Sequence, residues 1–423
     1  MVAIATKEDL IPLLFDAYIG IKRGCCVHRK DVAIPLTATL VVQALISMAA
    51  VTVPVFAPTA AADIGMSASY VGIYVGLIYF SSMASSLLSG DFILRYGALR
   101  ISQICLIFCG IGLSLTTVTG VPALVASALI IGLGYGPATP ASSHILARHT
   151  PEHLMAFIFS LKQTGVPLGG ALAGAIVPSL VLLAGWKFCS LAVSASCILL
   201  AISIQPFRAK IDGARRLGRH LSFKGITRPF EIVFSHPPLL QLAFISFCFA
   251  CMQVSLVTYL VIYLTKNVGM ALIMAGLILS AAQIAGMVGR IVWGFVADRY
   301  LKPRLVLGFL GVATTLEAVA TAFFNPGWSY PAIWLTIILF GATAIGWNGI
   351  YLAEAARLAP EGQVGMATGG TLFFTFLGVA VGSPIFAAIV TSTGSYPLGF
   401  IFFAILTFAC GMAVILFRDK KSN

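Results

Sequence analysis

The sequence has few charged side chains: Asp, Glu, Lys and Arg make up only 9% of its 423 residues, whereas 59% are hydrophobic. Soluble domains carry about 25% charged residues and about half apolar ones. A water-soluble fold of this size could not hide so much apolar surface, so lipid must surround most of the chain. The scarcity of charge therefore excludes a soluble protein.

Signatures of catalysis and of nucleotide binding are missing as well. No cluster of metal-ligating side chains and no nucleophile with its base stands out, which argues against a membrane-embedded enzyme. There is no phosphate-binding loop, and the longest soluble segment, about thirty residues, is too short for an ATPase. We expect no enzyme activity, no cofactor and no metal site, so gradients must drive any transport unless it is passive.

The sequence instead contains apolar runs of about twenty residues, the length needed to cross a membrane. They do not alternate with polar residues, so they predict helices and not the strands of a barrel. We predict an all-α integral membrane protein with twelve transmembrane helices, near residues 34–57, 69–92, 99–118, 121–147, 153–183, 187–206, 239–264, 270–293, 304–324, 331–355, 365–390 and 397–417.

The basic residues are distributed unevenly between the predicted loops. Of the 26 Lys and Arg residues, 22 fall in segments on one side, and the loops on the other side hold only Lys187 and Lys266. This asymmetry follows the positive-inside rule and places both termini in the cytoplasm, with the chain in the cell membrane. The net charge of +12 thus orients the chain, and we expect no nucleic-acid partner.

An internal repeat divides the chain into two halves. Residues 90–100 match residues 294–304, and further coincidences follow at nearly the same spacing. Two parallel six-helix halves are a transporter architecture, with the substrate path between them near the midplane. We predict a tail (1–33), an N-terminal bundle (34–206), a basic linker (207–238), a C-terminal bundle (239–417) and a second tail (418–423).

At the repeated segments, over essentially residues 34–417, the chain resembles the major facilitator superfamily. The signal is that family's loop motif between the second and third helix of each half, roughly G-x-x-x-D-R-x-G-x-R-[RK]. The C-terminal copy keeps Gly294, Asp298, Arg299 and Arg304 but has Leu301 in place of the second glycine. The N-terminal copy keeps Gly90, Arg95, Gly97 and Arg100 but has Leu94 in place of the acid, with Asp91 nearby.

The resemblance implies two six-helix bundles related by a pseudo-two-fold axis. Glycines allow close helix approach, and the motif's acid and arginines suit helix ends and ion pairs, so the eight motif residues are expected to form a cytoplasmic latch between conformational states. The alternative is a basic loop that only sets topology.

A glycine-rich stretch, residues 165–174, resembles the glycine-proline motif of the family's proton-driven exporters. Val166 interrupts the usual Gly-Pro pair, and Ala128 stands where those exporters carry an arginine. Small residues also simply let helices pack. Proton-coupled efflux of a drug or metabolite is therefore the alternative function.

Lys162 is the most suggestive ionisable residue because it lies about 13–16 Å into the fifth predicted span. A cation facing the central cavity would favour an anionic substrate, and the alternative is that it snorkels to the headgroups. Neutral residues complete the predicted substrate site or bond between helices: Gln43, Gln253, Trp347, Asn348 and Tyr351, with Gln283 as a further candidate.

Two residues are candidates for proton coupling. His144 titrates near physiological pH but has a structural histidine as its alternative. Glu317 lies within the ninth predicted span, where pairing with a neighbouring helix is the alternative. Glu354 precedes Arg357 by three residues, so an i,i+3 ion pair is expected there.

The sequence therefore predicts a monomeric secondary active transporter that moves a small organic anion, such as a carboxylate, by alternating access. Its coupling partner, H+ or a counter-substrate, is left open. A transporter-like membrane sensor that does not translocate its ligand is the lesser alternative.

Overall fold

The structure, a computed structural model, describes residues 29–118, 120–149, 158, 161–212, 227–360 and 364–416. These residues are almost entirely helical and contain no strand. The helices are α2 (Arg29–Ile64), α3 (Val71–Tyr96), α4 (Ala98–Leu115), α5 (Val121–Tyr135), α6 (Ala138–His149), α8 (Gly165–Ser203), α9 (Arg208–Ile211), α10 (Arg228–Ser235), α11 (Pro237–Lys266), α12 (Leu272–Arg299), α13 (Pro303–Ala322), α14 (Tyr330–Ala344), α15 (Asn348–Leu358), α16 (Val364–Thr393) and α17 (Tyr396–Leu416).

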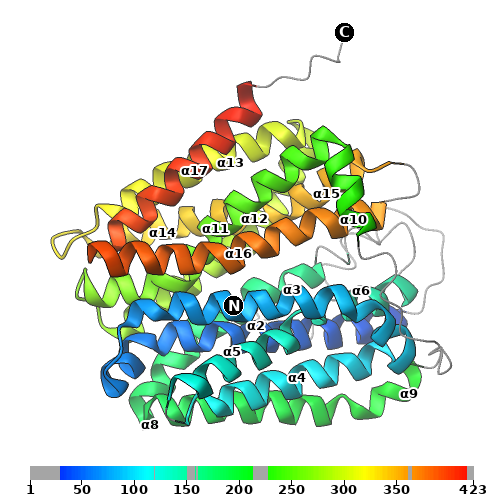
Figure 1. The fold of residues 1–423 in the computed structure, drawn as a ribbon, viewed down its shortest axis with the longest axis horizontal. Helices are drawn as coiled ribbons and strands as arrows, with labels where there is room; N and C mark the ends of the chain where they lie inside the picture. The colour runs from blue at the N-terminus through cyan, green and yellow to red at the C-terminus, as the bar shows by residue number, and fades with distance from the viewer. Residues whose placement is uncertain are drawn as a thin grey trace, which may run out of the picture.

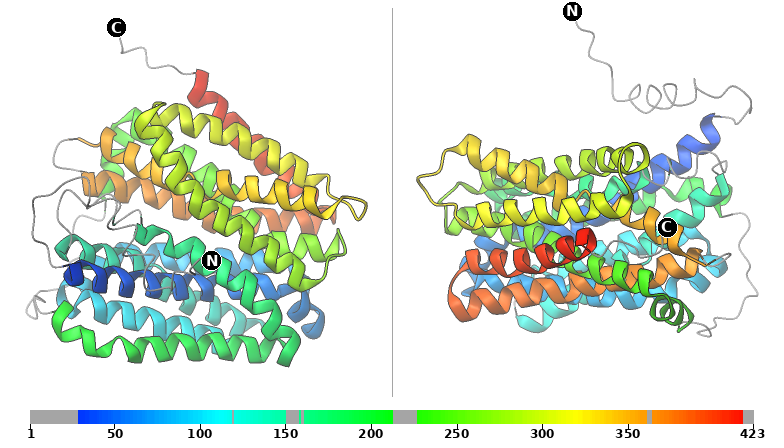
Figure 2. Two further views of the ribbon diagram at one scale, coloured as in Figure 1. Left: turned by 180° about the vertical axis from the view of Figure 1, so that it is seen from behind. Right: turned by 90° about the horizontal axis from the view of Figure 1, so that it is seen from above.

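Eleven stretches of the described chain are long and apolar enough to cross a membrane. The longest, Leu161–Phe207, has 47 residues and therefore about twice the length that one crossing needs. Within it, Ala184 and Gly185 leave the helical conformation, with φ +83° at Gly185, and the chain turns back on itself (Figure 2). This stretch thus supplies the fifth and sixth predicted spans, and the all-helical membrane fold is confirmed.

The helices form two bundles (Figure 1). Helices α2 to α9 lie together on one side and α10 to α17 on the other. The predicted division near the middle of the chain remains a prediction in its details, because most of the linker (213–226) and the tails (1–28 and 417–423) lie outside the described residues. The end where α3 joins α4 and α12 joins α13, on the right in Figure 1, is called the motif end below.

The bundles meet chiefly through α8 against α12, α3 against α16, and α2 against α11. Glycines allow the backbones to touch: a Cβ on Gly174 would lie 2.5 Å from the Gly276 carbonyl oxygen, and one on Gly76 would lie 2.4 Å from Pro384. Close approach through small residues is the usual way in which helices associate in lipid. The predicted packing role of the glycine stretch therefore has a direct structural basis.

Two spans that were predicted as continuous, 121–147 and 331–355, are interrupted. The first is interrupted at Gly136 and Pro137, where proline removes a backbone donor. The second is interrupted between Ala344 and Asn348, where the Trp293 indole instead donates to the Ala342 carbonyl at 2.8 Å. A hydropathy profile does not reveal such interruptions because the residues at these positions are mostly apolar.

Candidate substrate site

A cavity of about 60 Å³ lies between the two bundles. Helices α2, α3, α5 and α8 line it from one bundle, and α11, α12 and α16 line it from the other. Its polar lining consists of Ser47, Tyr79, Tyr135, Gln253, Thr258 and Gln283. Small-molecule pockets measure roughly 300–1,000 Å³, so the bundles enclose only a small space in this conformation.

Ser47 gives the cavity an unsatisfied polar group. Its hydroxyl is buried, and no described residue lies within hydrogen-bond distance of it. Buried polar groups are nearly always paired, and an exception needs an explanation. A hydroxyl that lines a cavity and has no partner is suited to a polar ligand.

Gln253 is held in place by two of the other predicted residues. The Trp347 indole and the Asn348 amide both donate to Gln253 Oε1, at 3.0 and 3.1 Å. Trp347 is completely buried and Gln253 lines the cavity. The structure thus brings together three residues that lie in two different predicted spans, and it orients the Gln253 carboxamide.

Two further predicted residues lie inside their own bundles and not in the cavity lining. The Gln43 carboxamide accepts a hydrogen bond from Thr139 at 3.3 Å. Tyr351 packs against Trp347, with ring centroids 5.3 Å apart, and accepts from Thr375 at 3.4 Å. Both side chains are buried. Their part in substrate binding stays a prediction.

Lys162 lies one helical turn from Val166, a cavity-lining residue, toward the motif end. The residue is only 1% exposed, so the structure does not show it reaching the headgroups. Its ammonium donates to the neighbouring Gln163 Oε1 at 3.3 Å and forms no ion pair with a described acid. A buried, unpaired cation beside the cavity is the site's main electrostatic feature.

Arg290 is a second cation near the cavity, and the sequence patterns above did not single it out. It lies two turns from the cavity-lining Gln283 on α12, toward the motif end. Its Nη1 donates to the Gln163 carbonyl of the other bundle at 2.9 Å, and its Nε donates to the Ile345 carbonyl at 3.2 Å. The signal was present, because an arginine within an apolar span is expensive in lipid.

Neither candidate for proton coupling lines the cavity. The Glu317 carboxylate on α13 accepts a hydrogen bond from Thr343 on α14, so it bonds to a neighbouring helix of its own bundle. His144 is half-buried on α6. Their roles in coupling remain predictions.

In the N-terminal motif, an acid from another segment accepts hydrogen bonds from the backbone next to the loop. Asp212, just after α9, accepts from the backbone N–H groups of Leu99 and Arg100 at 2.9 and 3.1 Å. These N–H groups belong to the first turn of α4 and have no acceptor within the helix. Asp212 therefore acts as the cap of α4. Gly97 has φ +98°, and a Cβ there would lie 2.3 Å from the Asp212 carboxyl carbon.

The remaining residues of the N-terminal motif make weaker contacts. Arg95 lies over the Tyr96 ring at 5.4 Å, and Arg100 bonds Gln103 at 3.4 Å and is exposed. Gly90 lies within α3. None of these contacts reaches the other bundle.

In the C-terminal motif, Arg304 bonds the Glu354 carboxylate at 3.2 Å. Arg357 bonds the same carboxylate at 2.6 Å, which confirms the expected i,i+3 ion pair. Because Glu354 is 0% exposed, this three-residue clamp ties α15 to the start of α13. The other motif residues, Gly294, Asp298 and the exposed Arg299, lie on the last turns of α12.

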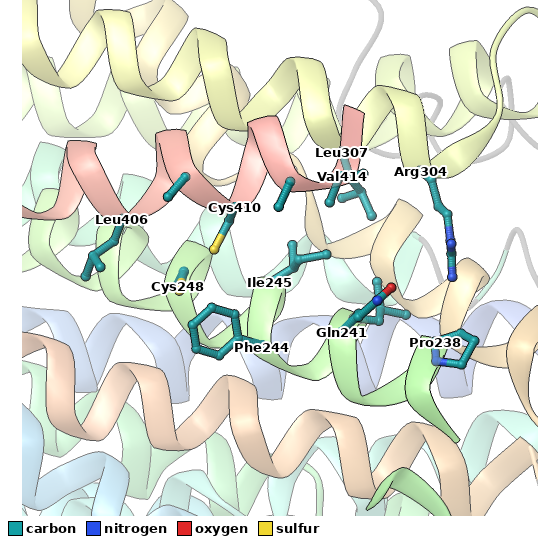
Figure 3. A pocket seen from close by; sticks show the side chains of 13 residues that line it. Pro238, Gln241, Phe244, Ile245, Cys248, Arg304, Leu307, Leu406, Cys410 and Val414 are labelled. Atoms are coloured by element: carbon teal, nitrogen blue, oxygen red, sulfur yellow. The ribbon is translucent and has the colours of Figure 1, made fainter. Parts of the chain in front are cut away.

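A second, larger space of about 340 Å³ lies within the C-terminal bundle, between α11, α13 and α17 (Figure 3). Its walls are apolar, with Gln241 and Arg304 at one end. Phe244 on its rim is 59% exposed, so the groove opens outward, where lipid surrounds the chain. It does not lie between the bundles and is not the candidate substrate site.

The fold is that of a multi-pass membrane protein with a cavity between two helical bundles, and the family match and the relatives below show a transporter and not an enzyme. The chain belongs to the Major Facilitator Superfamily, whose family model matches residues 39–383.

Curated relatives are similar along most of their length. The probable sulfoacetate transporter SauU of Cupriavidus necator is 24% identical over 83% of this chain and 85% of its own. The hexuronate transporter of Bacillus subtilis is 22% identical, covering 85% and 88%. The cis,cis-muconate transport protein of Acinetobacter baylyi is 24% identical, covering 77% and 80%.

Solved structures share the fold at low identity. A POT family transporter in complex with 5-aminolevulinic acid has a TM-score of 0.74 and 15% identity, covering 92% of this chain and 96% of that one. A bacterial homolog of the human lysosomal transporter Spinster, in an inward-facing and occupied conformation, has a TM-score of 0.70 and 14% identity, covering 93% and 97%.

Proposed function

We propose that this protein is a secondary active transporter of a small organic anion, such as a carboxylate. The observation that carries the proposal is Lys162, a buried cation beside the central cavity with no acidic partner among the described residues. An uncompensated buried charge is strongly unfavourable, so an anionic ligand that neutralises it would bind favourably. The three relatives above are named for sulfoacetate, hexuronate and muconate, all organic anions.

Alternating access is the mechanism that fits this arrangement. The two bundles enclose the cavity and touch through glycine-mediated contacts that can separate at one end or the other. The motif residues, Asp298 and Arg299 above all, form the gate at the motif end. We place that end in the cytoplasm, with both termini there, in the cell membrane, because the basic residues gather on that side. The protein acts as a monomer, with H+ or a counter-substrate as the coupling partner.

Proton-coupled efflux has less support than anion transport. The glycine stretch that suggested efflux lies in close helix contacts, which explain its glycines without a role in coupling. A Cβ on Gly169 would lie 2.1 Å from the Ala44 carbonyl oxygen, and Gly174 packs against α12. No acid lines the described part of the central cavity.

The test is uptake of radiolabelled organic anions into proteoliposomes that contain the purified protein. Replacing Lys162 with Gln keeps a polar side chain but removes the charge. We expect its apparent affinity to fall about 10- to 100-fold, since hydrogen bonds to charged groups contribute about 1.5–3 kcal/mol.

Lys266→Gln is the matched control, because it also removes one positive charge but lies at the exposed end of α11. Unchanged affinity in the Lys162 variant would refute the role of the cation. Binding of an organic anion without any flux would favour the sensor alternative over a transporter.

A further inference from the structure

Two cations, not one, lie at the motif end of the central cavity, and both contact the same residue. Gln163 accepts from Lys162 through its side chain, at 3.3 Å, and from Arg290 through its backbone carbonyl, at 2.9 Å. Lys162 belongs to the N-terminal bundle and Arg290 to α12 of the C-terminal bundle. Gln163 therefore links the two cations across the boundary between the bundles, with its side chain on one and its backbone carbonyl on the other.

The acceptors available to these cations do not satisfy them. An arginine side chain has five N–H donors and a lysine has three. Within the described structure, Arg290 uses two donors, both on neutral carbonyls, and Lys162 uses one on a neutral amide at a long distance. Five charged donors thus have no acceptor, and neither residue forms an ion pair there.

Both cations lie near the cavity on the helix faces that line it, although neither belongs to its lining. Lys162 is one turn from Val166, and Arg290 is two turns from Gln283, each on the motif-end side of a cavity-lining residue. Ile345, whose carbonyl Arg290 bonds, also lines the cavity. An anion in the cavity would therefore lie within one or two helical turns of both cations, at the same end.

We propose that Lys162 and Arg290 together bind a ligand with two negatively charged groups, a small dicarboxylate or a comparable dianion. In the bound state, Arg290 exchanges the Gln163 carbonyl for the second anionic group. Arginine binds carboxylates through two parallel hydrogen bonds that are stronger than its bonds to neutral carbonyls. A monoanion would neutralise only one of the cations, so the site discriminates by charge number. This inference rests on the proposed transport of organic anions and specifies its substrate class.

The test compares dicarboxylates with monocarboxylates of equal chain length, so that size is held constant: succinate with butyrate, glutarate with valerate, and adipate with hexanoate. Binding to the purified full-length protein is measured by calorimetry at fixed ionic strength, because salt screens charge. For at least one pair we expect the wild type to bind the dianion about 10- to 100-fold more tightly. Arg290→Gln should lose this preference while its affinity for the monoanion stays within about threefold.

Further variants show whether a lost preference comes from the two cations or from a general change of charge or a loss of folding. Lys266→Gln, with the same change of charge at an exposed position, should keep the preference. Arg290→Lys should retain part of it, because the charge remains but the two parallel bonds do not. If Arg290→Gln does not fold, Arg290→Lys and Lys162→Gln still test the proposal, since each should reduce the preference.

Two outcomes would overturn the inference while leaving organic-anion transport intact. One is equal affinity of the wild type for both members of every pair. The other is a preference for dianions that persists in the Arg290 and Lys162 variants. If no organic anion of either charge is bound or transported, the proposed function itself fails.

Discussion

Removing the carboxylate of Asp212 is expected to loosen the motif end of the N-terminal bundle. The two carboxylate oxygens accept from consecutive backbone N–H groups at the start of α4, those of Leu99 and Arg100. Asp212 is buried, so these donors would find no replacement acceptor in Asp212→Ala. The same substitution would release the end of α9 from the start of α4.

The expected loss of stability follows from three contributions. Loss of a helix cap costs about 1 kcal/mol, and loss of a negative charge at a helix N-terminus costs about 0.3–1 kcal/mol. The ion pair with Arg208, at 3.8 Å, adds only a few tenths because Arg208 is partly exposed to solvent. The sum is about 2 kcal/mol, which corresponds to a lowering of Tm by about 4–8 °C for a cooperative unit of the size of one bundle.

Thermal unfolding of the purified protein measures this effect, and hydrogen exchange at the first turn of α4 localises it. Asp212→Asn is the partial control, because its single amide oxygen can accept from only one of the two N–H groups and it carries no charge. It should lose less stability than Asp212→Ala, because one of the two hydrogen bonds is kept. An alanine variant with unchanged Tm and unchanged exchange at Leu99 and Arg100 would refute the capping argument.

Three further predictions concern the contacts between the bundles and the gate. Gly174→Ala places a Cβ 2.5 Å from a backbone oxygen of the other bundle, so we expect a loss of about 1–3 kcal/mol in thermal stability and slower flux. Gly369→Ala, within α16 and outside the motif, meets open space and should show neither effect. Tyr259→Phe removes the hydroxyl whose one proton is shared between the carbonyls of Ser69, in the other bundle, and Ser383, so at no more than about 1 kcal/mol it should raise the population open at the end opposite the motif by up to about fivefold, measured by spin-label distances. Asp298→Asn should slow transport in proteoliposomes while binding affinity changes less than about twofold; a wild-type rate would contradict the gating role.

Composition and hydropathy predicted the membrane and the helical class because these properties depend on long averages over the sequence, whereas the repeat was predicted from matching residues at a nearly constant spacing. The position of Lys162 within a span was also predictable, since a single cation in an apolar run is locally conspicuous. Arg290 carries the same signal in its own apolar run. Its importance depends on Gln163, which is 127 residues away in the chain.

Contacts between distant segments could not be predicted from local patterns. The N-terminal motif lacks its acid at Leu94, and nothing in its neighbourhood indicates that Asp212, 113 residues after Leu99, would accept its hydrogen bonds. The interrupted spans were missed for a different reason. Pro137 is apolar and does not lower the hydropathy of the first span, and in the second span the Trp293 indole from α12 bonds a carbonyl that the helix leaves free.

The interruption between α14 and α15 and the clamp around Glu354 together separate α15 from α14 and join it to α13. The helical hydrogen bonding stops between α14 and α15, whereas the clamp couples α15 to the start of α13. We therefore expect α15 and the start of α13 to move as one unit when the bundle rearranges. Arg290 bonds the carbonyl of Ile345 within the interruption. If Arg290 binds the ligand as proposed, occupancy of the cavity would act directly on the junction that carries this unit.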